Sequence, residues 1–105
     1  MKVKLIRDKV LPRGTGVSVE VASRSTHIAL LGAKLHEEAQ EIVESHCRKA
    51  EEYADLLQVL VDLALLNGVP VREIEQARAN KKAAKGGFLA GRVMVVDRAK
   101  GGGHG

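Results

Sequence analysis

The chain has 105 residues, a formal net charge of +4 and an apolar fraction of 45%. These values suit one small globular domain and exclude an intrinsically disordered chain. Aromatic residues make up only 2% of the sequence, too few for a surface that stacks the bases of a single-stranded nucleic acid. The small positive excess is compatible with a phosphorylated small molecule, and we expect no nucleic-acid partner.

The single cysteine, Cys47, excludes an intramolecular disulfide and fits a reducing cytosol. No apolar run reaches the roughly 18 residues that a membrane span needs. Residues 1–10 also lack the long apolar stretch of a signal peptide. These features predict a cytoplasmic protein that does not bind a membrane.

Residues 1–24 are expected to form an extended arm, because proline and glycine interrupt it. Within the arm, valines alternate with polar residues and predict a short strand over residues 17–21. A helix is expected to follow and to run to about Ser45, with apolar side chains on one side at helical spacing. Hydroxyl side chains within residues 23–26 can cap its beginning.

A second helix is expected from about Arg48 to Leu66, where Asn67 and Gly68 supply a stop signal. Apolar residues cover most of its circumference, and such a helix is buried on nearly all sides. Two other helices of a chain this short can hardly cover it. We therefore predict that it lies in a subunit interface, in a homodimer or a dimer of dimers.

A third helix is expected after Pro70 and to about Ala84, with a strongly basic end. Residues 92–96 predict a second short strand, which could pair with the first. Residues 97–105 are expected to form a flexible Gly-rich tail. Whether this tail belongs to the natural protein stays open. The predicted fold is an all-α helical bundle with short extended arms, formed by residues 1–96 as one domain and completed by oligomerisation.

Two short acidic runs carry the candidate chemistry. Glu38 and Glu41 lie three residues apart on the first helix, as Glu52 and Asp55 do on the second, so each pair shares a helix face. If the helices pack antiparallel across a turn near residues 45–47, the two pairs converge. A hard divalent cation such as Mg²⁺ then relieves their repulsion. The pattern alone leaves metal binding and solvated helix faces equally open.

Four segments in order resemble the all-α NTP pyrophosphohydrolase superfamily, which includes MazG-type enzymes, dimeric dUTPases and phosphoribosyl-ATP pyrophosphohydrolases. They are KLIRDKV at residues 4–10, E-x-x-E at 38–41, the stretch that begins EEYADLL at 51, and NKKAAKGGF at 80–88. The first and last are similar to the opening and closing motifs of the phosphoribosyl-ATP pyrophosphohydrolase-like branch, with Lys85 in place of the usual Arg. The resemblance spans residues 4 to about 96.

This resemblance implies a hydrolase of phosphoric anhydride bonds that cuts a nucleoside triphosphate between its α and β phosphates. It identifies Glu38, Glu41, Glu52 and Asp55 as ligands of Mg²⁺, for which Mn²⁺ can substitute. It gives catalytic roles to Glu38 and Glu37. Of these, Glu37 can orient or deprotonate the attacking water. Only ten residues separate Glu41 from Glu52, fewer than is usual, so the loop that shapes the substrate pocket is expected to differ.

Basic side chains are the candidates for holding the departing phosphates: Arg7, Lys9, Lys34, Lys81, Lys82 and Lys85. Lys34 can equally pair with Glu38, four residues later on the same helix. Arg7 and Asp8 can instead pair to pin the arm to the bundle. Asp62 and Asn80 are additional candidates. Asp62 can reach a second metal ion or a basic residue across the interface, and Asn80 can contact the substrate.

Other functions stay open from the sequence. A phosphoribosyl-ATP pyrophosphohydrolase of histidine biosynthesis would use the same chemistry on a dedicated substrate, and general nucleotide house-cleaning is not separable from it. A non-catalytic helical interaction module would use the acidic face to bind a partner. A small nucleic-acid binder would use the basic third helix.

Overall fold

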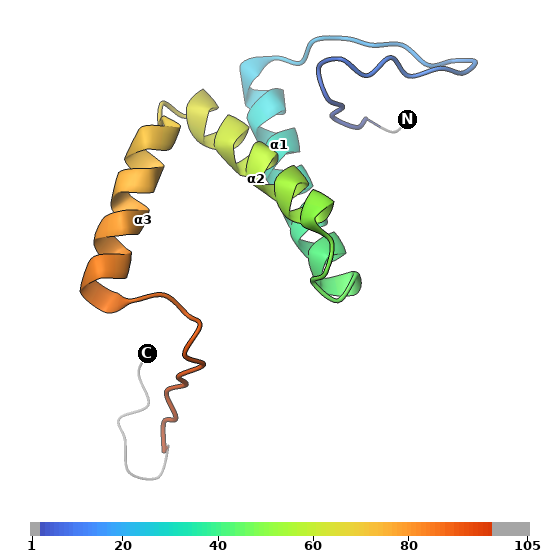
Figure 1. The fold of residues 1–105 in the computed structure, drawn as a ribbon. Coiled ribbons are helices and arrows are strands. Elements are labelled where there is room, and N and C mark those ends of the chain that lie inside the picture. The colour runs from blue at the N-terminus through green and yellow to red at the C-terminus, as the bar shows by residue number, and fades with distance from the viewer. Residues whose placement is uncertain (1–2, 98–105) are drawn as a thin grey trace. The chain divides into compact units, whose positions relative to one another are not determined.

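A computed structural model describes residues 3–97 and shows three α-helices and no β-strand within that range (Figure 1). Helix α1 spans Arg24–Glu44, α2 spans Ala50–Leu66 and α3 spans Val71–Lys85. Each helix begins and ends within two residues of its predicted limits. The all-helical character predicted from the sequence is confirmed.

The two predicted strands are wrong. Residues 17–21 and 92–96 adopt no regular secondary structure, and all their side chains are exposed. Alternating valines predict one apolar face, but a strand also needs a neighbouring strand to satisfy its backbone groups, and neither segment has one here. Of the predicted tail, residues 98–105 lie outside the described part of the chain.

The chain divides into two compact units, Met1–Ile74 and Glu75–Gly105, and each is described by itself. The first unit contains the arm, α1, α2 and the first turn of α3. The second contains the remainder of α3 and the segment that follows it. The expectation of one domain over residues 1–96 stays a prediction.

Helix α1 begins where the sequence predicts because Ser23 caps it. The Ser23 side chain accepts a hydrogen bond from the backbone N–H of Thr26 at 3.4 Å, and its carbonyl accepts one from His27 at 2.8 Å. The side chain thereby pairs one of the backbone donors that a helix leaves unsatisfied at its start, and the carbonyl accepts the first regular hydrogen bond of the helix.

The turn between α1 and α2 is tight and holds two non-glycine residues in the left-handed region. His46 and Cys47 both have a φ of 62°, a conformation that costs a non-glycine residue roughly 1–2 kcal/mol. Two hydrogen bonds offset that cost. The Cys47 N–H donates to the Ile42 carbonyl at 2.9 Å, and the Tyr53 hydroxyl donates to the Cys47 carbonyl at 2.9 Å. The turn thereby fixes the register of α2 against α1.

Helices α1 and α2 pack against each other as an antiparallel hairpin (Figure 1). Among residues 3–97, the buried apolar side chains are Leu31, Ile42 and Val59. Each contributes roughly 1.5–3 kcal/mol, whereas ordering the backbone costs about 1–2 kcal/mol for every residue. Most other large apolar side chains of the hairpin are only partly buried, and some are exposed, so part of its apolar surface remains unused.

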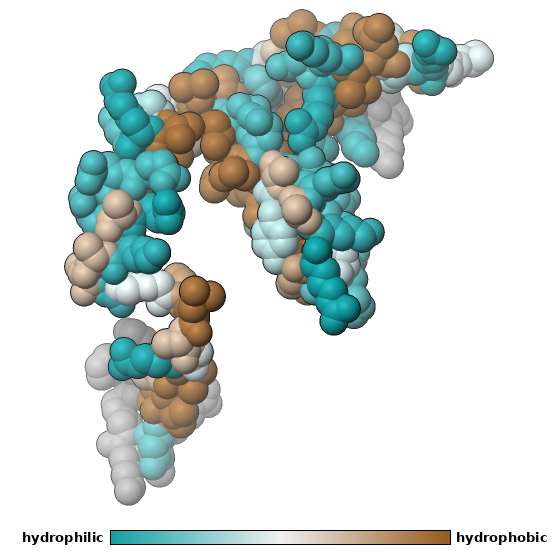
Figure 2. All heavy atoms as spheres, viewed as in Figure 1, coloured by the Kyte–Doolittle hydropathy of each residue, from teal (hydrophilic) through white to brown (hydrophobic). Residues whose placement is uncertain are grey.

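The unused surface lies mainly on α2. Leu57, Leu60 and Leu65 are 60%, 41% and 61% exposed, respectively. Figure 2 shows apolar surface at the C-terminal end of α2 and on the segment after α3. No single helix within residues 3–97 is both long and apolar enough to cross a membrane, and α2 and α3 meet that requirement only when counted together across the turn between them.

Candidate functional site

Glu38 is the buried charged residue of the described chain, with 6% of its surface exposed. It lies on α1, and its Oε1 atom is 3.6 Å from the Lys34 ammonium. Its Oε2 atom is buried and has no hydrogen-bond partner. A buried carboxylate oxygen without a donor is costly, because no water or protein group replaces its lost hydration. Lys34 therefore compensates only part of the charge, and the second oxygen is open to another positive group.

The charges of Glu37, Glu38 and Glu52 all act on the Glu41 carboxyl group. The negative charge of Glu38 is the largest cause of a raised pKa at Glu41, followed by partial desolvation, and the charges of Glu37 and Glu52 act in the same direction. Glu52 is half-buried on α2, and its carboxylate accepts a hydrogen bond from the Ser45 hydroxyl at the end of α1. The hairpin thus gathers negative charge from both helices on one side.

Asp55 is paired with a cation from the N-terminal arm. The Arg7 guanidinium lies 2.6 Å from the Asp55 carboxylate. A turn in which the Val10 N–H donates to the Arg7 carbonyl at 3.1 Å shapes the arm at this point. The alternative in which Arg7 pins the arm to the helices is therefore what the structure shows, and so is the Lys34–Glu38 pair.

Within residues 3–97, no three histidine, cysteine, aspartate or glutamate side chains are placed so that they could hold one metal ion. Three of the four predicted ligands instead have separate partners, which are Lys34 for Glu38, Ser45 for Glu52 and Arg7 for Asp55. Their chemistry still fits a hard divalent cation, because an unpartnered buried oxygen and an under-compensated carboxylate lie together. The donor atoms are present, but side-chain movement is needed to bring them onto one ion.

A cavity of about 910 Å³ lies between the arm, α1 and α2. Its apolar lining includes Leu31 and Val59. Its charged lining comes from all three segments: Lys4, Arg7, Asp8, Lys9, Lys34, Glu38, Asp55 and Asp62. Three of the six predicted phosphate-binding cations and three of the acidic candidates therefore line the same cavity. Its volume is in the range of cavities that hold a small organic ligand.

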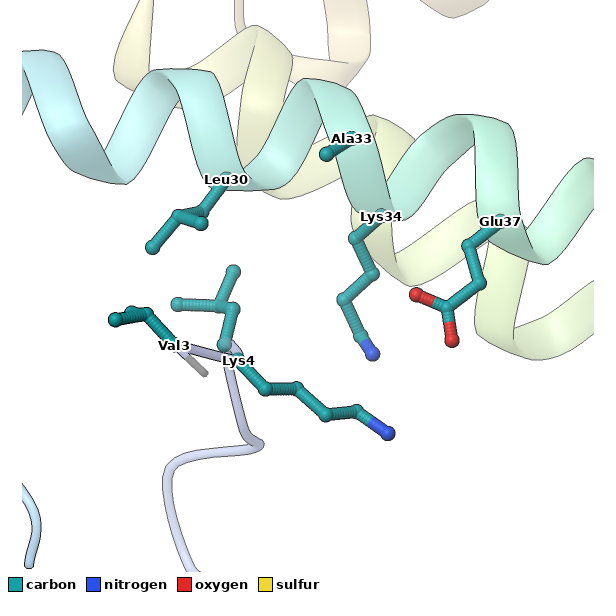
Figure 3. Close-up of a pocket in the computed structure, with 7 residues that line it drawn as sticks. Val3, Lys4, Leu30, Ala33, Lys34 and Glu37 are labelled. Atoms are coloured by element: carbon teal, nitrogen blue, oxygen red, sulfur yellow. The ribbon is translucent and has the colours of Figure 1, made fainter. Parts of the chain in front are cut away.

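A second cavity, of about 310 Å³, lies beside the first part of the arm. Figure 3 shows Lys34 and Glu37 projecting from α1 toward the arm, where Lys4 also lines the cavity. Glu37 is exposed on α1, so it is accessible to water as its predicted role requires. Lys34 lines both cavities and joins them.

The remaining candidates lie on α3. Lys81, Lys82 and Lys85 are exposed, and the Asn80 side chain accepts a hydrogen bond from Gln76 at 3.0 Å. These residues belong to the second compact unit, so the structure does not relate them to the carboxylates. Their contact with substrate stays a prediction.

Sequence reasoning missed the groups that hold the carboxylates in place. The sequence predicts Ser45 only as the end of the first helix. In the structure its hydroxyl also donates to Glu52, which lies seven residues later across one turn. Gln58, four residues before Asp62, donates to its carboxylate at 3.1 Å. The i,i+4 spacing of Gln58 and Asp62 is a signal that could have found the second contact.

Replacing Glu41 by glutamine is expected to raise Tm at pH 7. The pKa of Glu41 is raised above its usual 4.5 in the folded chain, so the folded state binds more protons than the unfolded state just above pH 4.5. The free energy of unfolding therefore falls as pH rises through that range, and the penalty is fully present at pH 7. Thermal unfolding of the variant and of Glu44→Gln, a control on the same helix, measures the difference. A gain that persists below about pH 3.5, where Glu41 is protonated in both states, contradicts this reading.

No protein-family model matches the chain, and comparison with curated proteins and with solved structures finds no match.

Proposed function

We propose that the chain is a magnesium-dependent pyrophosphohydrolase that hydrolyses a nucleoside triphosphate-type substrate to a monophosphate and pyrophosphate. Two lines of support meet in this proposal. The first is the resemblance of four ordered segments to the all-α NTP pyrophosphohydrolase superfamily. The second is a packed pair of antiparallel helices, of which one carries E-x-x-E and the other carries E-x-x-D.

The observation that carries the proposal is the buried Glu38 oxygen without a hydrogen-bond donor. The charges of Glu38 and Glu52 both act on Glu41, so negative charge from both helices gathers there. A solvated acidic face explains exposed carboxylates, but it does not explain a carboxylate that is 6% exposed with one oxygen unpaired. A divalent cation supplies the missing positive charge and prefers oxygen ligands. We propose that Glu38, Glu41, Glu52 and Asp55 hold it.

The remaining residues have roles that the chain itself can perform. Arg7, Lys9 and Lys34 line the larger cavity, where their charges can hold the phosphates and stabilise the leaving pyrophosphate. Glu37, exposed beside Lys34, can take a proton from the attacking water. Water adds to the α phosphorus, the bond from that phosphorus to the bridging oxygen breaks, and the oxygen leaves with pyrophosphate. The bound cation would neutralise phosphate charge and lower the pKa of water.

We also propose that the active form is a homodimer or a dimer of dimers. The supporting observation is the set of half-exposed leucines on α2, together with the three-residue apolar core of the described chain. A two-fold axis lets α2 pack against its own copy. It would also place the acidic hairpins of two subunits close to one bundle, as in helical bundles with metal sites between helices.

Release of pyrophosphate from a panel of nucleotides, with and without Mg²⁺, tests the proposed reaction. We expect release from at least one triphosphate and none after the cation is removed by chelation. Phosphoribosyl-ATP belongs in the panel, because preference for it would assign the chain to histidine biosynthesis. Equal signals with and without Mg²⁺ contradict the proposal.

A non-catalytic helical interaction module is the second candidate. The observation that favours it is the exposed apolar surface of α2 beside carboxylates that do not form a ligand set within residues 3–97. Such a module would show no divalent-ion dependence and no pyrophosphate release in the same panel. One assay therefore separates the two candidates.

A further inference from the structure

We propose that Arg7 is a removable counter-ion of Asp55, and that cation binding releases Arg7 into the larger cavity, where it can receive phosphate. This inference rests on the proposed function and deepens it, because it orders the binding events. It begins with the 2.6 Å contact between the Arg7 guanidinium and the Asp55 carboxylate. Asp55 is the proposed ligand whose partner comes from a distant segment, because Arg7 lies 48 positions before it in the chain.

The contact is built so that it can open. The side chains of Arg7 and Asp55 are 58% and 42% exposed, and an exposed ion pair contributes little stability. A divalent cation competes with the Arg7 guanidinium for Oδ1 of Asp55, because both are attracted to the same lone pairs. Glu38 lines the same cavity as Asp55, and its buried oxygen without a donor offers the cation a second point of attachment that Arg7 does not use. A divalent cation can therefore bind both carboxylates, whereas the arginine that it displaces contacts Asp55 alone.

The displaced arginine stays in place to act on the substrate. Arg7 lies in the lining of the larger cavity together with Lys9 and Lys34, and Leu5 and Ile6 of the arm are half-buried, which keeps the arm on the helices. A guanidinium freed from Asp55 is well suited to a phosphate group, since it binds two oxygens at once. Cation binding would thus precede productive phosphate binding.

The affinity of the protein for Mn²⁺ alone, measured by electron paramagnetic resonance of the free ion, tests this order of events. Replacing Arg7 by methionine should raise the affinity about two- to fivefold, because an exposed ion pair of this size no longer competes. Lys9→Met is the matched control: it removes one positive charge from the same arm and the same cavity lining without removing a partner of Asp55. Its change in affinity should be smaller than that of Arg7→Met.

Reactivity of arginines toward phenylglyoxal, mapped by mass spectrometry on the wild-type chain, gives a second readout. Modification of Arg7 should accelerate when Mn²⁺ is added, while the exposed Arg13 of the same arm should be unaffected. Mn²⁺ binding that is equal in wild type, Arg7→Met and Lys9→Met, with no change at Arg7, overturns the exchange and leaves the proposed function standing. Absence of any Mn²⁺ binding in wild type overturns both.

Discussion

Replacing Glu38 by glutamine is expected to lower divalent-ion affinity and pyrophosphate release by at least about 10- to 100-fold, the range seen when groups that support a metal site are removed. The reason is the position of its carboxylate, buried and with one oxygen unpaired. The folded chain should not lose stability, because the substitution removes a partly uncompensated buried charge. Calorimetric titration with Mn²⁺ and thermal unfolding of the same samples give both quantities.

Glu44→Gln is the matched control for this experiment. Glu44 lies on the same helix and is exposed, and its carboxylate accepts a hydrogen bond from Gln40 at 2.8 Å. Glu44 is not among the charges that act on Glu41. We expect wild-type affinity and activity from this variant. If Glu38→Gln retains wild-type Mn²⁺ binding, the cation site lies elsewhere or does not exist.

Replacing Leu60 by aspartate is expected to prevent assembly and to unfold the protein. In the single chain Leu60 is 41% exposed, so the change would be mild if the chain were a monomer. In a two-fold dimer the same change removes roughly 1.5–3 kcal/mol of apolar burial from each subunit and buries two charges. Small domains are stabilised by only about 5–15 kcal/mol in total, so the dimer should not survive it.

Sedimentation and far-ultraviolet circular dichroism measure the two consequences. Val21→Asp is the control, because Val21 is 99% exposed on the arm and lies outside α2. That variant should remain folded and assembled. A folded monomeric Leu60→Asp variant with wild-type stability would contradict the proposed interface.

The sequence was sufficient to predict the helices because their signals are local. Ser23 caps α1 by a contact three residues along the chain, and the stop signal after Leu66 is likewise contained in the next two residues. The pairing of Glu38 and Glu41 on one helix face likewise follows from helical periodicity. These features depend on short-range geometry that one sequence contains.

The partners of the carboxylates depend on tertiary contacts and were harder to predict. The sequence left open whether Arg7 contacts phosphate or pins the arm, and its contact with Asp55 spans 48 positions. The strands were mispredicted because alternation of valines does not provide a neighbouring strand. The oligomer and the roles of the α3 lysines depend on contacts beyond single helices, and both stay predictions.

Phosphorus NMR of a hydrolysed nucleoside triphosphate tests the central claim most directly, because it identifies both the bond that breaks and the need for Mg²⁺. We expect resonances of pyrophosphate and of a nucleoside monophosphate that appear together, only when Mg²⁺ is present, and that are lost in Glu38→Gln. A nucleoside diphosphate with orthophosphate, or an unchanged triphosphate in the presence of Mg²⁺ across the nucleotide panel, would contradict the assignment of this chain as a pyrophosphohydrolase.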